Sequence, residues 1–269
     1  MLARACPALQ RHPRSLLFGW ALLAALGATP DAAAQVNVEG LRKALTAPGV
    51  HGRLSGSLTT YQGNTVGTEL GGVVLVGYRE ERQLVYFNAT ANYSRFGGEA
   101  RVAKTFAHLR YNYSFSPWVA AEAFTQGESD EFRRLRLRTL VGAGPRFTLV
   151  DSDHATLFYG VSYMLEHTSL ASSVEDTPVR PATVHRMSHY AALRVVLEPD
   201  RAALSHTLYY QPRVDDLRDV RLLNVTSLDV TILGRLSASL QATLRWESPV
   251  PPGIKEVDLT VKNLLGVTF

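Results

Sequence analysis

The segment His167–Ser169 places a histidine and a serine two residues apart. On an extended strand, residues two apart lie on the same face, so the imidazole could act as a general base towards the serine hydroxyl. No Asn, Asp or Glu that could orient the histidine is evident nearby on that face, which also carries Tyr163 and Leu165. The competing interpretation is a polar strand end that enters a loop, and we favour it.

Three histidines, His185, His189 and His206, form the other group with metal-binding side chains. His185 and His189 are four residues apart, which on a strand separates their side chains by about 13 Å. One ion cannot bridge that distance, so we expect neither a metal nor any other cofactor. The only cysteine, Cys6, lies in an N-terminal segment that we expect to be removed. Disulfides, thiolate metal sites and a cysteine nucleophile are therefore excluded from the mature chain.

Residues 1–34 have the features of a secretory signal peptide for Sec export. A basic start, an apolar run and small residues before a cleavage point follow in order: Arg4, Arg11 and Arg14; Leu16–Leu26; Ala32 and Ala34. We expect cleavage near Ala34/Gln35. The mature chain then keeps 25 basic and 23 acidic residues, and its net charge of +2 gives little reason to expect a nucleic-acid partner.

From about residue 50 onward, polar and apolar residues alternate with a period of two, which is typical of half-buried β-strands. The composition, 46% hydrophobic and 19% charged, excludes a disordered chain. No apolar run of 18 residues follows position 40, which excludes transmembrane helices. Twelve strands are predicted, at 50–62, 66–79, 82–96, 100–115, 118–127, 131–149, 154–169, 184–198, 202–212, 219–232, 236–248 and 255–269. No linker interrupts them, so we predict a lead-in at 35–49 and one domain over 50–269.

Three features favour a membrane-spanning barrel over a soluble sandwich. The strands often reach twelve residues or more, whereas strands of soluble proteins average about five or six. Aromatic residues gather near strand ends, and short connections alternate with longer ones. We therefore predict an all-β fold, a twelve-stranded antiparallel transmembrane β-barrel of the bacterial outer membrane. Both ends of the barrel sequence then lie on the periplasmic side, with the short turns.

The last strand ends in an aromatic residue, Phe269, with Leu259, Val261, Leu265 and Val267 on the same face. A terminal aromatic residue on an alternating last strand resembles the signal read by the outer-membrane barrel assembly machinery. We therefore predict that Phe269 is an assembly signal.

Charged residues on the inward face form the remaining candidate site. Arg134, Arg136 and Arg138 share one face of the sixth strand, and three cations so close repel one another unless acids compensate them. We expect hairpin folding to bring Glu122 opposite Arg136 and Glu166 opposite Arg138. A second mixed-charge group is predicted on the last three strands, from Asp229, Arg245, Glu247, Asp258 and Lys262. The prediction is a ladder of cross-strand ion pairs that narrows the lumen, with excess positive charge at Arg134.

Four sequence stretches occur in an order found in a known family. They are GRLSGSLTTYQGNT at Gly52–Thr65, LRTLVGAGPRF at Leu137–Phe147, LSHTLYYQP at Leu204–Pro212, and the closing RWESPVPP…VDLTVKNLLGVTF. In this respect the chain resembles the salt-induced outer-membrane protein family over about residues 50–269. The resemblance implies an outer-membrane β-barrel with no established substrate. The family has no catalytic motif, so the resemblance implies no catalytic residues in this sequence.

We predict an envelope protein without enzymatic activity. It would be a structural or stress-response barrel, or a narrow passive pore with a charged lumen. The alternative is an outer-membrane lipid hydrolase, of the phospholipase or lipid A deacylase type, that uses His167 and Ser169. The expected partners are outer-membrane lipid and lipopolysaccharide, the barrel assembly machinery and periplasmic chaperones. The chain is expected to be a monomer that binds no nucleic acid.

Overall fold

The computed structural model describes residues 45, 47–61, 67–96, 99–131, 135–170, 183–250 and 256–269. The predicted signal peptide lies outside the described residues, as do residues 35–44 and 46 of the predicted lead-in. The strands are β1 (Gly49–Tyr61), β2 (Gly67–Glu80), β3 (Gln83–Phe96), β4 (Glu99–Ser114), β5 (Val119–Asp130), β6 (Leu135–Asp151), β7 (Ala155–Leu170), β8 (Thr183–Glu198), β9 (Ala202–Pro212), β10 (Val220–Leu233), β11 (Leu236–Ser248) and β12 (Val257–Thr268). Each strand begins and ends within four residues of its predicted bounds. In the described parts of the chain, no helix is long and apolar enough to cross a membrane.

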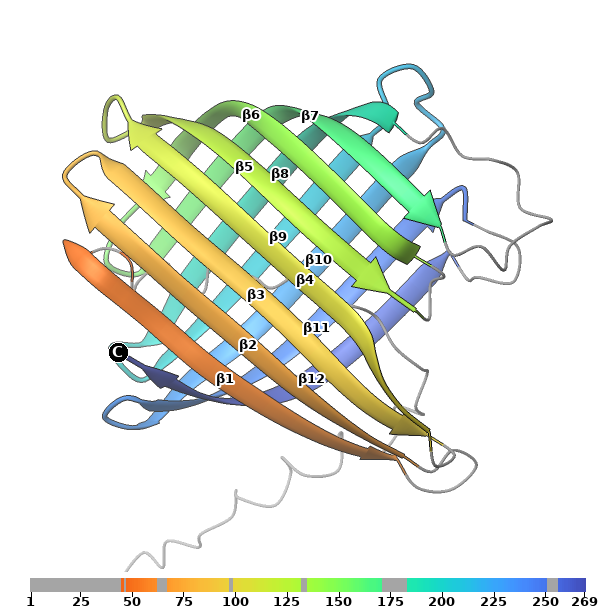
Figure 1. Cartoon of the computed structure of the whole chain (residues 1–269). Helices are drawn as coiled ribbons and strands as arrows, with labels where there is room; N and C mark the ends of the chain where they lie inside the picture. The colour runs from red at the N-terminus through yellow and green to blue at the C-terminus, as the bar shows by residue number, and fades with distance from the viewer. Residues whose placement is uncertain are drawn as a thin grey trace, which may run out of the picture. The chain divides into compact units, whose positions relative to one another are not determined.

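The strands form a closed antiparallel barrel, in which each strand pairs with its neighbours in sequence and β1 pairs with β12 (Figure 1). The predicted twelve-stranded antiparallel barrel is therefore confirmed. Tight connections at 81–82, 115–118, 152–154, 199–201 and 234–235 lie at one end, which we call the short-turn end. The strand ends that are joined by 62–66, 97–98, 131–134, 171–182, 213–219 and 249–256 lie at the other end, which we call the loop end. Apart from 97–98, each of these has at least four residues, whereas the tight connections have two to four, in line with the predicted alternation.

The burial pattern is inverted relative to a soluble protein. Large apolar side chains point outward and remain exposed, including Leu137 (47% exposed), Leu244 (43%) and Leu259 (40%). Charged and polar side chains point inward and are buried, for example Arg110 and Asn88. Alternation with a period of two generates both faces, and an apolar exterior around a polar interior is the arrangement of a transmembrane barrel.

A β-bulge at the start of β6 corrects part of the sequence prediction. The pairing of β6 with β7 shifts between Leu135 and Leu137. Because a bulge sets two residues against one, it reverses which residues face inward. Leu135 is buried, whereas Arg136 is exposed and only Arg138 of the two described arginines points into the lumen. The prediction that Arg136 faces inward is wrong, and Arg134 lies outside the described residues.

The closing seam between β1 and β12 is short. Its register covers Arg53–Gly56 against Leu265–Thr268, whereas β1 pairs with β2 along its whole length. Reciprocal backbone hydrogen bonds of 2.9 Å between Gly52 and Phe269 extend the seam by one residue pair. A Cβ atom on Gly52 would collide with the Phe269 ring and would lie 2.8 Å from the Leu75 carbonyl oxygen, which is fixed in the β1–β2 pairing, so glycine is needed for this close approach. The terminal residue is thus part of the barrel wall.

Deletion of Phe269 should impair assembly. The variant loses both backbone hydrogen bonds to Gly52 and the ring that covers it, in a seam that has few pairs to lose. We expect less heat-modifiable protein in the outer-membrane fraction, measured on gels of heated and unheated samples. Phe269→Leu, which keeps the backbone pairing, is the control and should assemble better than the deletion. Normal insertion of the deletion variant would contradict a role in assembly.

Candidate functional site: the charged lumen

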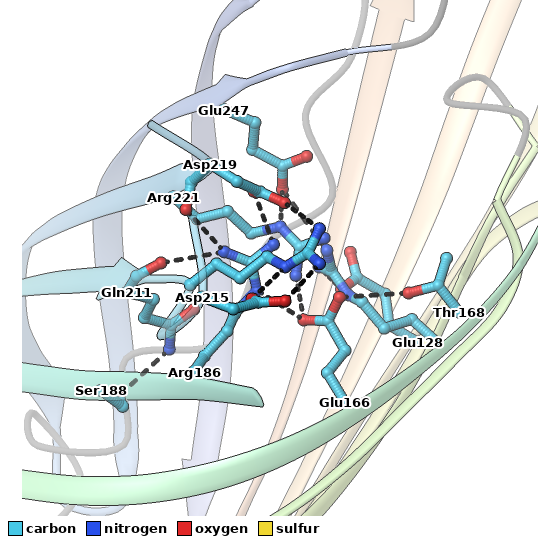
Figure 2. Close-up of polar contacts among 12 residues, drawn as sticks. Glu128, Glu166, Thr168, Arg186, Ser188, Gln211, Asp215, Asp219, Arg221 and Glu247 are labelled. Carbon is cyan, nitrogen blue, oxygen red and sulfur yellow. Dashed lines mark hydrogen bonds and ion pairs between the residues drawn. The ribbon is translucent and has the colours of Figure 1, made fainter. Parts of the chain in front are cut away.

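Eight buried charged side chains form one ion-pair network in the loop-end half of the lumen, most of which is labelled in Figure 2. We call it the lumen network, and it consists of Glu128, Arg138, Glu166, Arg186, Asp219, Arg221, Arg245 and Glu247. No member is more than 10% exposed. Four arginines face four carboxylates, so these eight side chains have no net charge, and the less buried Arg213 lies 3.9 Å from Asp219 at the edge of the network. That balance matters, because an unpaired charge in a buried site costs several kcal/mol.

One half of the network joins β5 and β6 to β11. Arg138 forms ion pairs with Glu128 and, at 3.4 Å from Nη1 to Oε1, with Glu247. Arg245 Nη1 lies 3.1 Å from Glu128 Oε1 and 3.7 Å from Glu247 Oε1. Each of these four side chains therefore has at least two charged partners.

The other half joins β7, β8 and β10. Arg221 forms an ion pair with Glu166, and its Nε lies 3.5 Å from Glu247 Oε1, which links the two halves. Arg186 Nε lies 3.4 Å from Glu166 Oε2, and its Nη2 donates a hydrogen bond of 2.6 Å to Asp219 Oδ1. Figure 2 shows these side chains converging from separate strands.

The network crosses the barrel. In the strand order, five strands lie between β5 and β11 in either direction, so these two strands stand on opposite walls. The ion pair between Glu128 and Arg245 connects them directly. The pair between Glu166 and Arg221 makes a second bridge, from β7 to β10. At this level the lumen is occupied by side chains that bind one another.

The predicted pairing partners of Glu122 and Glu166 are wrong. Glu122 lies opposite Gly144, because β5 continues to Asp130 and the β5–β6 connection is centred later than we expected. Glu166 lies opposite Leu140, because the β6–β7 turn is centred one residue later. A small error in a turn position moves the whole register of a hairpin. Both carboxylates still face inward and form ion pairs, although with other arginines.

The predicted second charge group is divided among different partners. Asp229 pairs with Arg53 at 3.3 Å. Lys262 pairs with Glu69, also at 3.3 Å. Arg245 and Glu247 belong to the lumen network, and Asp258 is half-buried opposite Arg245 in the β11–β12 register. The members face the lumen as predicted, but they do not form one cluster.

A separate charged group occupies the short-turn half of the lumen. Glu122 lies 3.4 Å from both Arg110 Nη1 and Arg146 Nε, and it accepts a hydrogen bond of 2.6 Å from the Tyr190 hydroxyl. The guanidinium of Arg110 also lies over the rings of Tyr190 and Phe124, at 5.4 Å and 5.2 Å from their centroids. Here one carboxylate is paired with two arginines, whereas the lumen network has equal numbers of arginines and carboxylates.

Sequence reasoning missed Glu128, Arg186, Asp219 and Arg221. The period of two could have identified Arg186, which shares its face of β8 with Ser188 and Tyr190. Arg221 is harder to find, because its inward neighbours on β10, Leu223 and Val225, are apolar. Asp219 precedes β10, where no strand pattern applies.

The His167 and Ser169 pair does not adopt the geometry of a general base and nucleophile. His167 is exposed on the outward face, and its Nδ1 lies 3.0 Å from Thr183 Oγ1 on β8. No hydrogen bond joins His167 to Ser169 among the described residues. The hydroxyl that the imidazole contacts therefore belongs to a different strand.

His189 and His206, two of the three histidines considered as metal ligands, each contact a neighbouring hydroxyl, and His206 Nε2 also lies 3.4 Å from Asn224 Nδ2. His189 Nδ1 lies 2.9 Å from the Tyr159 hydroxyl, and His206 Nδ1 lies 3.0 Å from Thr226 Oγ1. The described residues contain no group of three or more His, Cys, Asp or Glu that could hold a metal ion.

The loop that precedes β10 carries an exposed ion pair outside the membrane-spanning strands. Arg213 Nη2 donates a hydrogen bond of 2.7 Å to Asp215 Oδ2. This interaction lowers the pKa of Asp215 below its ordinary value and raises that of Arg213. Both shifts favour the charged forms of the two side chains.

A family model described as Protein of unknown function, DUF481, matches residues 54–269. No curated protein matches the sequence. Among solved structures, an outer membrane channel from Pseudomonas putida F1 has 13% identity and a TM-score of 0.49, over 83% of this chain and 96% of that one. The translocator domain of the autotransporter NalP from Neisseria meningitidis has 14% identity and a TM-score of 0.44, over 86% and 92%. The KdgM porin, in complex with disordered oligogalacturonate, has 8% identity and a TM-score of 0.43, over 82% and 97%.

Proposed function

We propose that this chain, which belongs to the family described as Protein of unknown function, DUF481, is an outer-membrane barrel whose lumen is closed by the lumen network. The observation that carries the proposal is the bridge from Glu128 on β5 to Arg245 on β11, between opposite walls. A barrel of twelve strands lies between those filled by side chains and those with a wide channel. Buried ion pairs that connect opposite walls of the barrel favour a structural envelope barrel over an open porin.

The apolar exterior and the alternation of short and longer connections support placement in the outer membrane, with the short-turn end towards the periplasm. In this proposal lipid and lipopolysaccharide surround a monomeric barrel, which the barrel assembly machinery inserts after delivery by periplasmic chaperones. Export by an N-terminal signal peptide belongs to the same proposal. The proposal of a closed structural barrel does not include a role in a stress response, such as salt stress.

Single-channel recording in a planar bilayer tests the closed lumen. The purified wild-type barrel should conduct poorly. The double variant Arg138→Ala/Glu247→Ala removes one cation and one anion from the network, so it opens space without leaving excess charge. We expect it to conduct more than the wild type, in steps of constant size.

The matched control is Glu198→Ala/Arg201→Ala, a pair at 3.0 Å whose side chains are 55% and 69% exposed at the short-turn end. It should conduct like the wild type. If the wild type already conducts steadily and the network variant does not change the current, the protein is a passive pore, which is the second candidate function. The cavities at the short-turn end favour that candidate, because part of the lumen is not filled.

A further inference from the structure

Two adjoining cavities occupy the short-turn half of the lumen. The larger has a volume of 700 Å³, within the range of about 300–1,000 Å³ that is usual for small-molecule sites. The smaller has a volume of 270 Å³ and shares Arg194 and Val196 with the larger one as lining residues. Neither is lined by a member of the lumen network.

The larger cavity is lined by arginines from three strands: Arg79 on β2, Arg146 on β6 and Arg194 on β8. Two carboxylates, Asp151 and Asp153, also line it, but both are exposed at the end of β6 and in the following turn. The buried part of the cavity is therefore basic, and the acidic groups lie where water screens them.

Arg146 is a buried cation with spare hydrogen-bonding capacity. It is 6% exposed. Its Nε lies 3.4 Å from Glu122, and its guanidinium lies 4.8 Å from the centroid of the Phe158 ring. Its Nη1 is buried and donates no hydrogen bond to any described residue. Arg146 also lines the larger cavity, so its guanidinium places a positive charge beside any ligand bound there.

Arg194 is the second cation that can reach a ligand. It is half-buried, lines both cavities and has no carboxylate within ion-pair distance in the part of the chain that the structure describes. Its register partner on β7 is Thr156, whose side chain also lines the larger cavity. A guanidinium presents paired N–H groups that match the two oxygens of a carboxylate or phosphate.

We propose that the larger cavity binds a small organic oxyanion, a carboxylate or a phosphate, held between Arg146 and Arg194. The ligand enters from the short-turn end. Thr156 supplies a hydroxyl donor, and the Phe158 ring supplies an apolar wall. Three arginines and two exposed carboxylates line this cavity, so its lining favours a negatively charged ligand. This site goes beyond the proposed function and does not depend on whether the lumen network closes the barrel.

Isothermal titration calorimetry on the purified, folded barrel in detergent tests the site at about 0.15 M salt, where weak surface attraction is screened. Citrate and inorganic phosphate are the two probes, and chloride is already present as the competing anion. We expect saturable binding of at least one probe with one site per barrel. Arg194→Gln should weaken it by about tenfold or more, since a charge-assisted pair is lost.

Arg201→Gln is the control. Arg201 is exposed at the same end of the barrel and lines only the smaller cavity, so this variant should bind within about twofold of the wild type. Arg146→Gln should also weaken binding, and heat-modifiable migration will show whether it folds. If it does not fold, Arg194→Gln decides alone. Absence of saturable binding by both probes, or equal losses in Arg194→Gln and Arg201→Gln, would overturn the proposal. Tighter binding of citrate or of phosphate identifies which oxyanion the site prefers.

Discussion

Replacing Leu244 with arginine should lower the free energy of unfolding by about 2–4 kcal/mol. Leu244 lies in the middle of β11, points outward and is 43% exposed in the isolated chain, so in the membrane its side chain contacts lipid. A charged side chain at that depth loses its hydration. Equilibrium unfolding by guanidinium or urea from lipid vesicles measures the change.

Leu217→Arg is the matched control, because it makes the same substitution in the loop that precedes β10. Leu217 is 71% exposed and lies between strands, so the cost should be within about 0.5 kcal/mol. An inward position such as Thr243 is unsuitable, because it is 1% exposed and has no space for arginine. Equal costs at Leu244 and Leu217 would mean that Leu244 does not face lipid.

Glu128→Gln is expected to destabilise the barrel by about 3–5 kcal/mol, because it leaves charges buried without compensation. Glu128 is 2% exposed and forms ion pairs with both Arg138 and Arg245. The glutamine keeps the size of the side chain but removes the charge that both guanidiniums face. The free energy of unfolding in detergent, measured by denaturant titration, gives the effect.

The second measurement for this prediction is a double-mutant cycle with Arg138→Gln. Residues in one ion-pair network couple by about 0.5–3 kcal/mol, so the double variant should be less destabilised than the sum of the single variants. The exposed pair Glu198 and Arg201 provides the comparison, and its cycle should give about 0–1 kcal/mol. Additive effects of Glu128→Gln and Arg138→Gln would exclude a coupled network.

Strand number and direction, and most of the inward and outward faces, could be predicted from the sequence because they depend only on a period of two. On β11 the inward set Ser239, Gln241 and Thr243 and the outward Leu244 are where alternation places them. The prediction failed at Arg136, where a bulge reverses the faces and nothing in the local pattern of LRLR marks it.

The ion-pair partners could not be predicted, for two physical reasons. Register depends on the centre of each turn, and the β5–β6 connection is centred far enough from our expectation to place Glu122 opposite Gly144. In addition, long side chains cross the lumen and meet residues on distant strands, as Glu128 meets Arg245. Hairpin geometry describes only adjacent strands, so it identifies the charges but not their partners across the barrel.

The short seam has a consequence for the order in which the barrel folds. Eleven of the twelve strand pairings join neighbours in sequence and can form as local hairpins. The pairing of β1 with β12 joins the two ends of the barrel sequence. Its formation therefore has the largest entropic cost of loop closure, and the short seam forms few hydrogen bonds to offset that cost. Closure of the barrel is thus the single non-local pairing step in folding. Its entropic cost is lowest when the eleven hairpins have already formed, because they bring β1 and β12 close together. Gly52 and Phe269 are far apart in the chain but pair in this seam, so substitutions at either residue should change the rate of barrel closure.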